Sequence, residues 1–376
     1  MVIDYDDLAR SRPENVIRLA ISLGIQTAGK THHQICWEII RWYKDHPQPK
    51  MKNRWTGPLV YKNPSTGNCN QEKMIMGASV WSNDFYADRE AERKAKKTDA
   101  FEHHRAMATK PMDEQHIHDL MSPKRKKIRE ARDSAEHPNS LPIATLFDIT
   151  GSMSSSPKAF QQKLGSLMNR LIAKGYTADP QILVGCIGDS NDRFSSKGTY
   201  FDGSCQIGEF ESGIEIDDCL TRCWLAGGGG GSNHESYQNA AYFFARHVVT
   251  DCFEKRNQKG IIVMLGDEHP YDVVSSAEVK ALFDDNIQED IPTRQIFAEL
   301  AEKWDVFFIV PRETANGSDP EIFAGWRGLL GNENVFSLEH AGNVSELVAL
   351  IVGIREGKIA SLDEIGRASC RERVSS

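Results

Sequence analysis

Three oxygen-bearing side chains alternate near the middle of this 376-residue chain: Asp148, Thr150 and Ser152. They follow a short apolar run from Ile143 to Phe147, whose composition predicts a strand buried on both faces of a parallel sheet. Cap-type residues and a proline from Ser154 to Pro157 predict that a helix begins directly afterwards. Because open α/β sheets bind ligands at the carboxyl ends of their strands, we expect the three side chains to line a crevice.

One carboxylate and two hydroxyls suit a small, hard cation. Mg²⁺ is the natural candidate because it keeps several of its waters and needs few protein charges, and Mn²⁺ can use the same ligands. The alternative is purely structural, since an Asp and a Ser at such a turn also cap helices.

The run Asp148-Ile149-Thr150-Gly151-Ser152 resembles the D-x-S-x-S motif that begins the metal-ion-dependent adhesion site of von Willebrand factor A (VWA) domains, with Thr in place of the first Ser. The segment from Trp81 to Gly353 is similar to a family of bacterial and phage VWA proteins without an assigned activity. The resemblance implies a Mg²⁺ ion with one open coordination position. Water fills that position until a carboxylate of a partner protein replaces it.

The resemblance also implies that two further loops complete the metal site. The third loop contains Asp267, at the end of an apolar run where the family usually shows T-D-G. The second loop departs from the family pattern, because five glycines, Gly227 to Gly231, precede the polar residues. Ser232 is the preferred hydroxyl ligand, with Glu235 and Ser236 as alternatives. The glycines could equally serve as a hinge.

Helical and strand patterns alternate along the rest of the chain, which predicts an α/β, doubly wound, mostly parallel sheet with helices on both faces, a VWA or Rossmann-like fold. The predicted strands are 181–187, 205–210, 260–265, 305–311 and 334–338, and the predicted helices are 160–174, 214–225, 237–248, 293–303, 320–330 and 344–354. The predicted VWA domain therefore covers residues 141–360.

A mainly helical and irregular region precedes this domain. Residues 1–48 predict a helical hairpin that resembles SAP modules, and residues 49–140 predict a charged, loop-rich and helical extension, with one helix at 84–97. The letters from Gly24 to Thr31 match the P-loop pattern, but helical spacing precedes them where a P-loop needs a strand, so we interpret the match as a coincidence. Residues 364–376 resemble a translated sequencing adaptor and are excluded from the fold.

Composition limits the classes of partner. A formal net charge of −8 argues against binding nucleic acid over the whole surface. A local basic cluster could contact phosphate or face the acidic remainder of the chain; it contains Lys124, Arg125, Lys126, Lys127, Arg129 and Arg132.

Eight cysteines without a CxxC pair, and no apolar run of about 18 residues, predict a cytoplasmic protein without membrane contact. Two groups could suggest zinc, namely Cys219 with Cys223 and a set of histidines, but both lack ligand partners at the usual spacing, so we interpret them as ordinary residues. The histidines are His103, His104, His116 and His118.

Two further acidic residues at predicted strand ends, Asp189 and Glu268, complicate a simple binding site, because extra carboxylates weaken the attraction of the metal for an incoming anion. They suggest an alternative, a metal-dependent phosphoesterase or nuclease in which Asp148, Asp189, Asp267 and Glu268 hold two ions about 4 Å apart. We favour the protein-interaction module over the enzyme.

Overall fold

The computed structural model describes residues 16–17, 20, 25–32, 34–36, 38–39, 81–153, 156–192, 201–225, 227–228 and 232–360. The chain divides into two compact units, Met1–Lys73 and Met74–Ser376. The predicted boundary at residue 48 and the suspected adaptor sequence at 364–376 lie outside the described residues.

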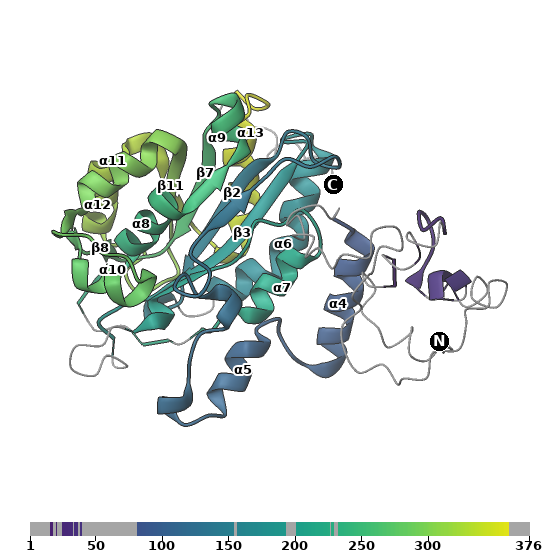
Figure 1. Cartoon of the computed structure of the whole chain (residues 1–376), viewed down its shortest axis with the longest axis horizontal. Coiled ribbons are helices and arrows are strands. Elements are labelled where there is room, and N and C mark those ends of the chain that lie inside the picture. The colour runs from purple at the N-terminus through teal and green to yellow at the C-terminus, as the bar shows by residue number, and fades with distance from the viewer. Residues whose placement is uncertain are drawn as a thin grey trace, which may run out of the picture. The chain divides into compact units, whose positions relative to one another are not determined.

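A six-stranded sheet forms the centre of the second unit (Figure 1). Neighbouring strands are parallel except the last pair, which is antiparallel. This mixed, mostly parallel sheet confirms the predicted fold class. In spatial order its strands are β12 (Val335–Leu338), β11 (Trp304–Pro311), β7 (Gly260–Leu265), β2 (Leu141–Asp148), β3 (Pro180–Ile187) and β4 (Cys205–Ile207).

Helices cover both faces of the sheet (Figure 1), because alternate side chains of each strand point to opposite faces. Along β2, Ile143 and Phe147 join one apolar core, whereas Ala144 and Leu146 join the other. The first core includes side chains of α6 (Ser156–Ala173), α7 (Glu215–Arg222) and α13 (Val344–Arg355). The second includes those of α8 (Tyr237–His247), α10 (Ser276–Phe283), α11 (Thr293–Lys303) and α12 (Pro320–Leu330).

Most long elements occur where the sequence predicts them, and α11 and α12 begin and end at the predicted residues. The strand expected at 205–210 is shorter, and its antiparallel direction was not predicted. The sequence analysis also missed short elements, which contain too few residues to show a clear helical or strand pattern. They are α9 (Asp251–Arg256), α10, and the pairs β5 (His234–Glu235) with β8 (His269–Pro270) and β9 (Val273–Val274) with β10 (Ile291–Pro292).

The segment at 81–140 packs onto this sheet domain. Trp81, Phe101 and Met121 lie in the same apolar core as β2, and β1 (Arg129–Ala131) pairs in parallel with β6 (Val248–Thr250). The segment also carries α4 (Asn83–Lys96) and α5 (Glu102–Ala108). Its apolar side chains therefore share the core of the domain.

Ion pairs hold α4 against α7. Asp217 on α7 is fully buried, and it accepts hydrogen bonds from Arg93 at 2.5 Å and from Arg89 at 2.9 Å. Arg89 also pairs with Asp218 at 2.8 Å. Two guanidinium groups thus compensate one buried carboxylate.

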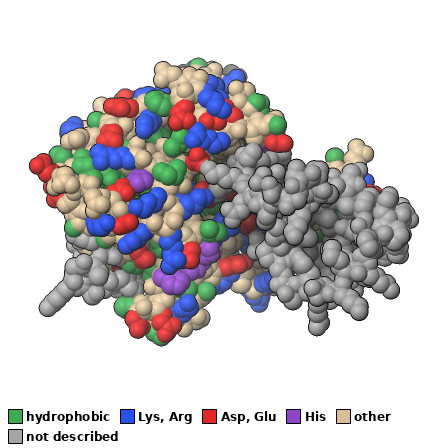
Figure 2. Space-filling model, viewed as in Figure 1, with side chains coloured by type: hydrophobic (Ala, Val, Ile, Leu, Met, Phe, Trp, Pro, Cys, Tyr) green, Lys and Arg blue, Asp and Glu red, His purple; other side chains and the backbone are tan. Residues whose placement is uncertain are grey.

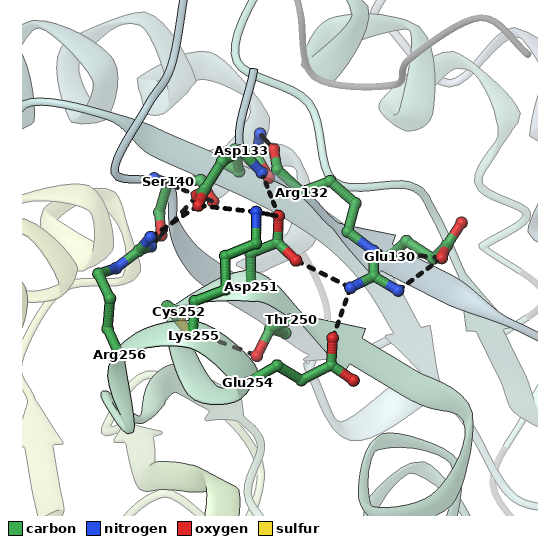
Figure 3. Close-up of polar contacts among 11 residues, drawn as sticks. Glu130, Arg132, Asp133, Ser140, Thr250, Asp251, Cys252, Glu254, Lys255 and Arg256 are labelled. Carbon is green, nitrogen blue, oxygen red and sulfur yellow. Dashed lines mark hydrogen bonds and ion pairs between the residues drawn. The ribbon is translucent and has the colours of Figure 1, made fainter. Parts of the chain in front are cut away.

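A second network fixes the chain just before β2 (Figure 3). Arg132 donates to Asp251 at 2.9 Å, and Arg256 donates to Asp133 at 2.7 Å. Asp133 also accepts the hydroxyl of Ser140 at 2.7 Å. These contacts link the segment at 130–140, which leads into β2, to α9.

The basic cluster contacts acidic groups of its own chain. Lys126 lies 2.5 Å from Glu209, and Lys127 lies 3.3 Å from Asp284. Arg129 is fully buried and donates to the carbonyls of Ile207 and Gly208 at 2.7 Å each. These contacts support the intramolecular interpretation, and nucleic-acid binding through Lys124 to Lys127 stays a prediction.

In the first unit, the P-loop letters form a helix cap. The described residues before them, at 16–17 and 20, are helical. The hydroxyl of Thr31 accepts from the backbone of Gln34 at 3.3 Å, and the Gln34 side chain accepts from the backbone of Thr31 at 2.8 Å, which is a capping box. Lys30 is paired with Glu38 at 2.6 Å. The interpretation of the P-loop match as a coincidence is therefore correct for these residues.

Across the described ranges, no helix has the length and apolar character needed to cross a bilayer. The six cysteines in these ranges are buried and free of disulfide bonds. Figure 2 shows histidine side chains gathered in one patch on the visible face. His103 packs its ring against those of His116 and His118, at centroid distances of 6.0 and 5.3 Å.

Candidate metal site

The first loop is organised around Asp148, which ends β2 and is fully buried. One of its oxygens, Oδ1, accepts the backbone N–H of Thr150 at 2.8 Å and the Thr150 hydroxyl at 2.6 Å. The hydroxyls of Thr150 and Ser152 lie 3.2 Å apart. A short 3-10 helix, η3 (Gly151–Met153), carries Ser152 into this position. The strand end therefore presents one carboxylate and two hydroxyls together, as the sequence suggested.

The third loop brings Asp267 to the same place. Strands β2 and β7 are parallel neighbours with Phe147 opposite Leu265, so Asp148 and Asp267 leave the sheet at the same edge. The Ser152 hydroxyl donates to Oδ1 of Asp267 at 2.7 Å. The backbone N–H of Asn316 donates to Oδ2 of Asp267 at 2.9 Å. Four of the five predicted ligands thus form one hydrogen-bonded set.

Tyr237, at the start of α8, is a site residue that the sequence analysis did not identify. Its hydroxyl donates to Oδ2 of Asp148 at 2.8 Å. The ring is fixed by edge-to-face contacts with Phe308 and Trp326, at centroid distances of 5.5 and 5.2 Å. A Cβ atom at Gly266 would lie 1.8 Å from the Tyr237 hydroxyl, so glycine is required there.

The three candidates in the second loop have different surroundings. Ser232 is exposed, and its hydroxyl donates to the carbonyl of His234 at 3.3 Å and lies 3.3 Å from the hydroxyl of Tyr271. Ser236 is buried, and its hydroxyl lies 3.0 Å from that of Ser190. Glu235 is also fully buried, but neither of its carboxylate oxygens has a hydrogen-bond partner. Of the three, Glu235 alone combines full burial with side-chain oxygens that meet no donor.

A backbone contact joins the second loop to the first. The carbonyl of Gly228 accepts the N–H of Gly151 at 2.8 Å. Gly228 has a φ of 92°, and a Cβ atom there would lie 1.9 Å from Oδ2 of Asp192. Because only glycine fits this backbone shape and this space, the glycine run has a structural use at Gly228.

Burial and mutual repulsion raise the pKa values of the carboxyl groups in the site. Burial is the main reason why the pKa of Asp148 is about 7, and Asp267 raises it further. Burial, then the charges of Asp148, Glu268 and Asp189, raise the pKa of Glu235 to about 11. The pKa of Glu268 is raised as well, again mainly by burial. A divalent cation would relieve this repulsion, since it binds the ionised carboxylates.

The donors fit a hard cation that retains water. Asp148 and Asp267 supply carboxylate oxygens, and Thr150 and Ser152 supply neutral hydroxyls, which suits Mg²⁺ better than zinc. Within the described part of the chain, no three His, Cys, Asp or Glu side chains are grouped to hold a metal ion by themselves. The phosphoesterase hypothesis, with its cluster of four carboxylates, stays a prediction.

Comparisons with known proteins give distant structural likenesses. No family model matches the chain, and no curated protein matches its sequence. The pilus adhesin SpaC from Lactobacillus rhamnosus GG is 10% identical over 61% of this chain and 31% of that chain, with a TM-score of 0.41. Proximal thread matrix protein 1 from the mussel byssus, with a zinc-occupied MIDAS motif, is 13% identical over 58% of this chain and 46% of that chain, with a TM-score of 0.31. The chain thus spans less than half of either protein.

Proposed function

We propose that this domain is a protein-interaction module that depends on a divalent cation. Asp148, Thr150, Ser152 and Asp267 would hold Mg²⁺, and an oxygen of a partner protein would take an open coordination position, with an Asp or Glu carboxylate as the expected donor. The observation that carries the proposal is the continuous set of hydrogen bonds among these four side chains at one edge of the sheet.

The charges of the donors support binding rather than catalysis. When bound, the cation would supply a Lewis-acidic point of attachment for the partner. Asp148 and Asp267 balance its two positive charges, while the hydroxyls of Thr150 and Ser152 coordinate without adding negative charge. Tyr237 and the backbone N–H of Asn316 hold the outer oxygens of the two carboxylates and orient them. A cytoplasmic location, expected from the scattered cysteines of the sequence, is part of the proposal.

Thermal unfolding of the full chain tests the metal site. Mg²⁺ or Mn²⁺ at a hundred times its dissociation constant should stabilise the protein by roughly 2.7 kcal/mol relative to EDTA, a rise of about 2 to 4 °C in Tm per kcal/mol. Asp148→Ala should abolish the shift. Asp305→Ala is the matched control, because Asp305 lies at the opposite end of the sheet and pairs with Arg355. An unshifted wild-type protein would refute the proposal.

The phosphoesterase hypothesis makes a separate prediction. Turnover of a generic phosphodiester should require Mg²⁺ or Mn²⁺ and should disappear in Asp267→Asn. Inertness with both metals would exclude it under those conditions.

A further inference from the structure

The carboxylate of Glu235 is buried without compensation. Its side chain has no solvent exposure, and neither oxygen meets a donor in hydrogen-bonding geometry; the polar group beside it is another carboxyl group, that of Glu268. The backbone around it is held in place: β5 pairs with β8, and the N–H of Ser236 donates to the carbonyl of Gly188 at 3.0 Å. The chain therefore keeps this carboxylate in the interior rather than letting it turn to water.

The neighbours of Glu235 place it at the proposed metal site. Glu235 is opposite Pro270 in the β5–β8 pair, three residues beyond Asp267. Two residues after Glu235, Tyr237 donates to Asp148. Asp148 is also the charged group that acts most strongly on Glu235, followed by Glu268. The carboxylate thus belongs to the region between the first and third loops.

A second buried glutamate, Glu278, provides a comparison, because its carboxylate is hydrogen-bonded within the fold. Glu278 on α10 is 4% exposed, close to the full burial of Glu235. It accepts the hydroxyl of Ser190 at 2.5 Å and the side-chain N–H of Asn239 at 3.0 Å. Glu235 has no such donors and faces the carboxyl group of Glu268 instead. A buried carboxylate is costly unless it is paired or bound to metal, so two adjacent buried carboxyl groups favour a cation as their partner.

We propose that Glu235 holds the cation through one of the cation's water molecules and thereby adds a third negative charge to the site. The role through water agrees with the absence, in the described residues, of three carboxylates grouped directly around one point. Mg²⁺ and Mn²⁺ retain such waters readily. This inference rests on the proposed function.

The third charge has opposite effects on the cation and on the partner. With Asp148, Asp267 and Glu235 ionised, the summed charge of the cation and the carboxylates is −1. Without Glu235 the two aspartates neutralise the cation, and the sum is 0. Glu235 should therefore strengthen cation binding and weaken the binding of a partner carboxylate. The wild-type site should then discriminate less between an acidic group and a neutral oxygen, such as a hydroxyl or an amide, than an adhesion site without this glutamate.

The test is Mn²⁺ binding by the full chain, measured as free Mn²⁺ by electron paramagnetic resonance. Glu235→Gln should raise the dissociation constant of Mn²⁺ about 10- to 100-fold, the usual effect of losing an outer partner of a metal site. With Mn²⁺ saturating, the same variant should bind acetate more tightly. Acetate replaces water on the Mn²⁺ ion, so its binding is measured as a fall in the relaxation rate of the water protons. Glu278→Gln, the buried control, should change neither value.

The outcomes separate this inference from the proposed function. If wild-type protein binds no Mn²⁺, the proposed function fails. If wild-type binds Mn²⁺, Asp148→Ala does not, and Glu235→Gln matches wild type, only the role of Glu235 is refuted. A loss in Glu268→Gln instead would assign that role to Glu268. Should Glu235→Gln fail to fold, Glu235→Asp keeps the charge and should retain Mn²⁺ binding within a few fold, whereas a full loss would refute a role through water.

Discussion

Tyr237 connects the core of the domain to the first loop, because its ring packs among Phe308 and Trp326 while its hydroxyl donates to Asp148. The hydrogen bond orients the carboxylate before any cation arrives. A ligand that is already oriented loses less entropy on binding, so we expect Tyr237 to influence metal affinity without touching the metal.

Tyr237→Phe should lower the stability of the metal-free protein by about 1.5 to 3 kcal/mol, the usual contribution of a hydrogen bond to a charged group. It should also weaken Mn²⁺ binding. Urea denaturation in EDTA and a Mn²⁺ titration measure the two effects. Tyr242→Phe is the control, since Tyr242 donates to Asp285 at 3.0 Å, away from the three loops. Equal Mn²⁺ affinity in both variants would contradict the orienting role.

The sequence predicted most of the site, named Glu235 only as an alternative to Ser232, and missed Tyr237, for a physical reason. Asp148, Thr150 and Ser152 are close in sequence, and Asp267 ends a clearly apolar strand, so local patterns reveal them. Glu235 and Tyr237 act through burial and through contacts with distant strands. No pattern of neighbouring residues distinguishes a glutamate that is buried from one that is exposed.

Among the elements, α4 is held against α7 by a few ion pairs. Its outer face is polar, and Arg89 and Arg93 pair with the buried Asp217 of α7. The sequence predicted a helix at 84–97 in a charged extension but gave no partner for its arginines. The structure shows instead that two of its arginines face a helix more than a hundred residues away.

Replacing both arginines of α4 by methionine should destabilise the protein by about 3 to 5 kcal/mol, because Asp217 would be left buried and unpaired. The Asp217→Asn change should restore much of that loss. Lys96→Met on the same helix is the control, as Lys96 pairs with the exposed Glu92 and should cost at most about 0.5 kcal/mol. Chemical denaturation compares the wild type with these three variants, and equal stabilities would contradict the stabilising role of the ion pairs between α4 and α7.

The contact between the segment at 130–140 and α9 should stabilise the fold less at acidic pH. Arg256 and Ser140 hold the pKa of Asp133 at about 2, below its ordinary value of 3.8, against the opposing effect of burial. A lowered pKa stabilises the fold above pH 3.8, and this contribution is lost as the pH falls from 3.8 through 2.

Asp133→Asn should therefore be less stable than wild type at pH 6, and the difference should shrink towards pH 2. Urea midpoints at several pH values measure it. Asp113→Asn is the comparison, because Asp113 is exposed. A difference that stays constant with pH would show that Asp133 does not act through its charge.

At the scale of the whole molecule, the boundary at Lys73 and Met74 separates two units, each with a core of its own among the described residues. A chain that starts at Met74 should unfold at the same urea concentration as the sheet domain of the full protein. A chain that starts at Leu141 should not, because it lacks Trp81, Phe101 and Met121 from the core. Comparing their urea curves by tryptophan fluorescence tests both statements.

The residue pattern predicted the class of fold and its layers, because buried strands and amphipathic helices have strong local patterns. It did not give the arrangement of the segment at 81–140, whose few apolar residues are spread over sixty positions. The direction of β4 was also hidden, because a three-residue strand carries too little pattern to fix its orientation.

Arg129 lies at the edge of this sheet. β4 is the last strand on its side, and the guanidinium group binds the carbonyls of Ile207 and Gly208 there. Both Arg129 and β4 are buried, so this edge is closed to water, and the guanidinium group also lies 3.3 Å from the carboxylate of Glu209. Arg129→Leu would leave two carbonyl groups and this carboxylate in the interior without that donor. The variant should therefore be less stable than the wild type by about 3 to 5 kcal/mol, measured by urea denaturation, and equal stability would contradict this role.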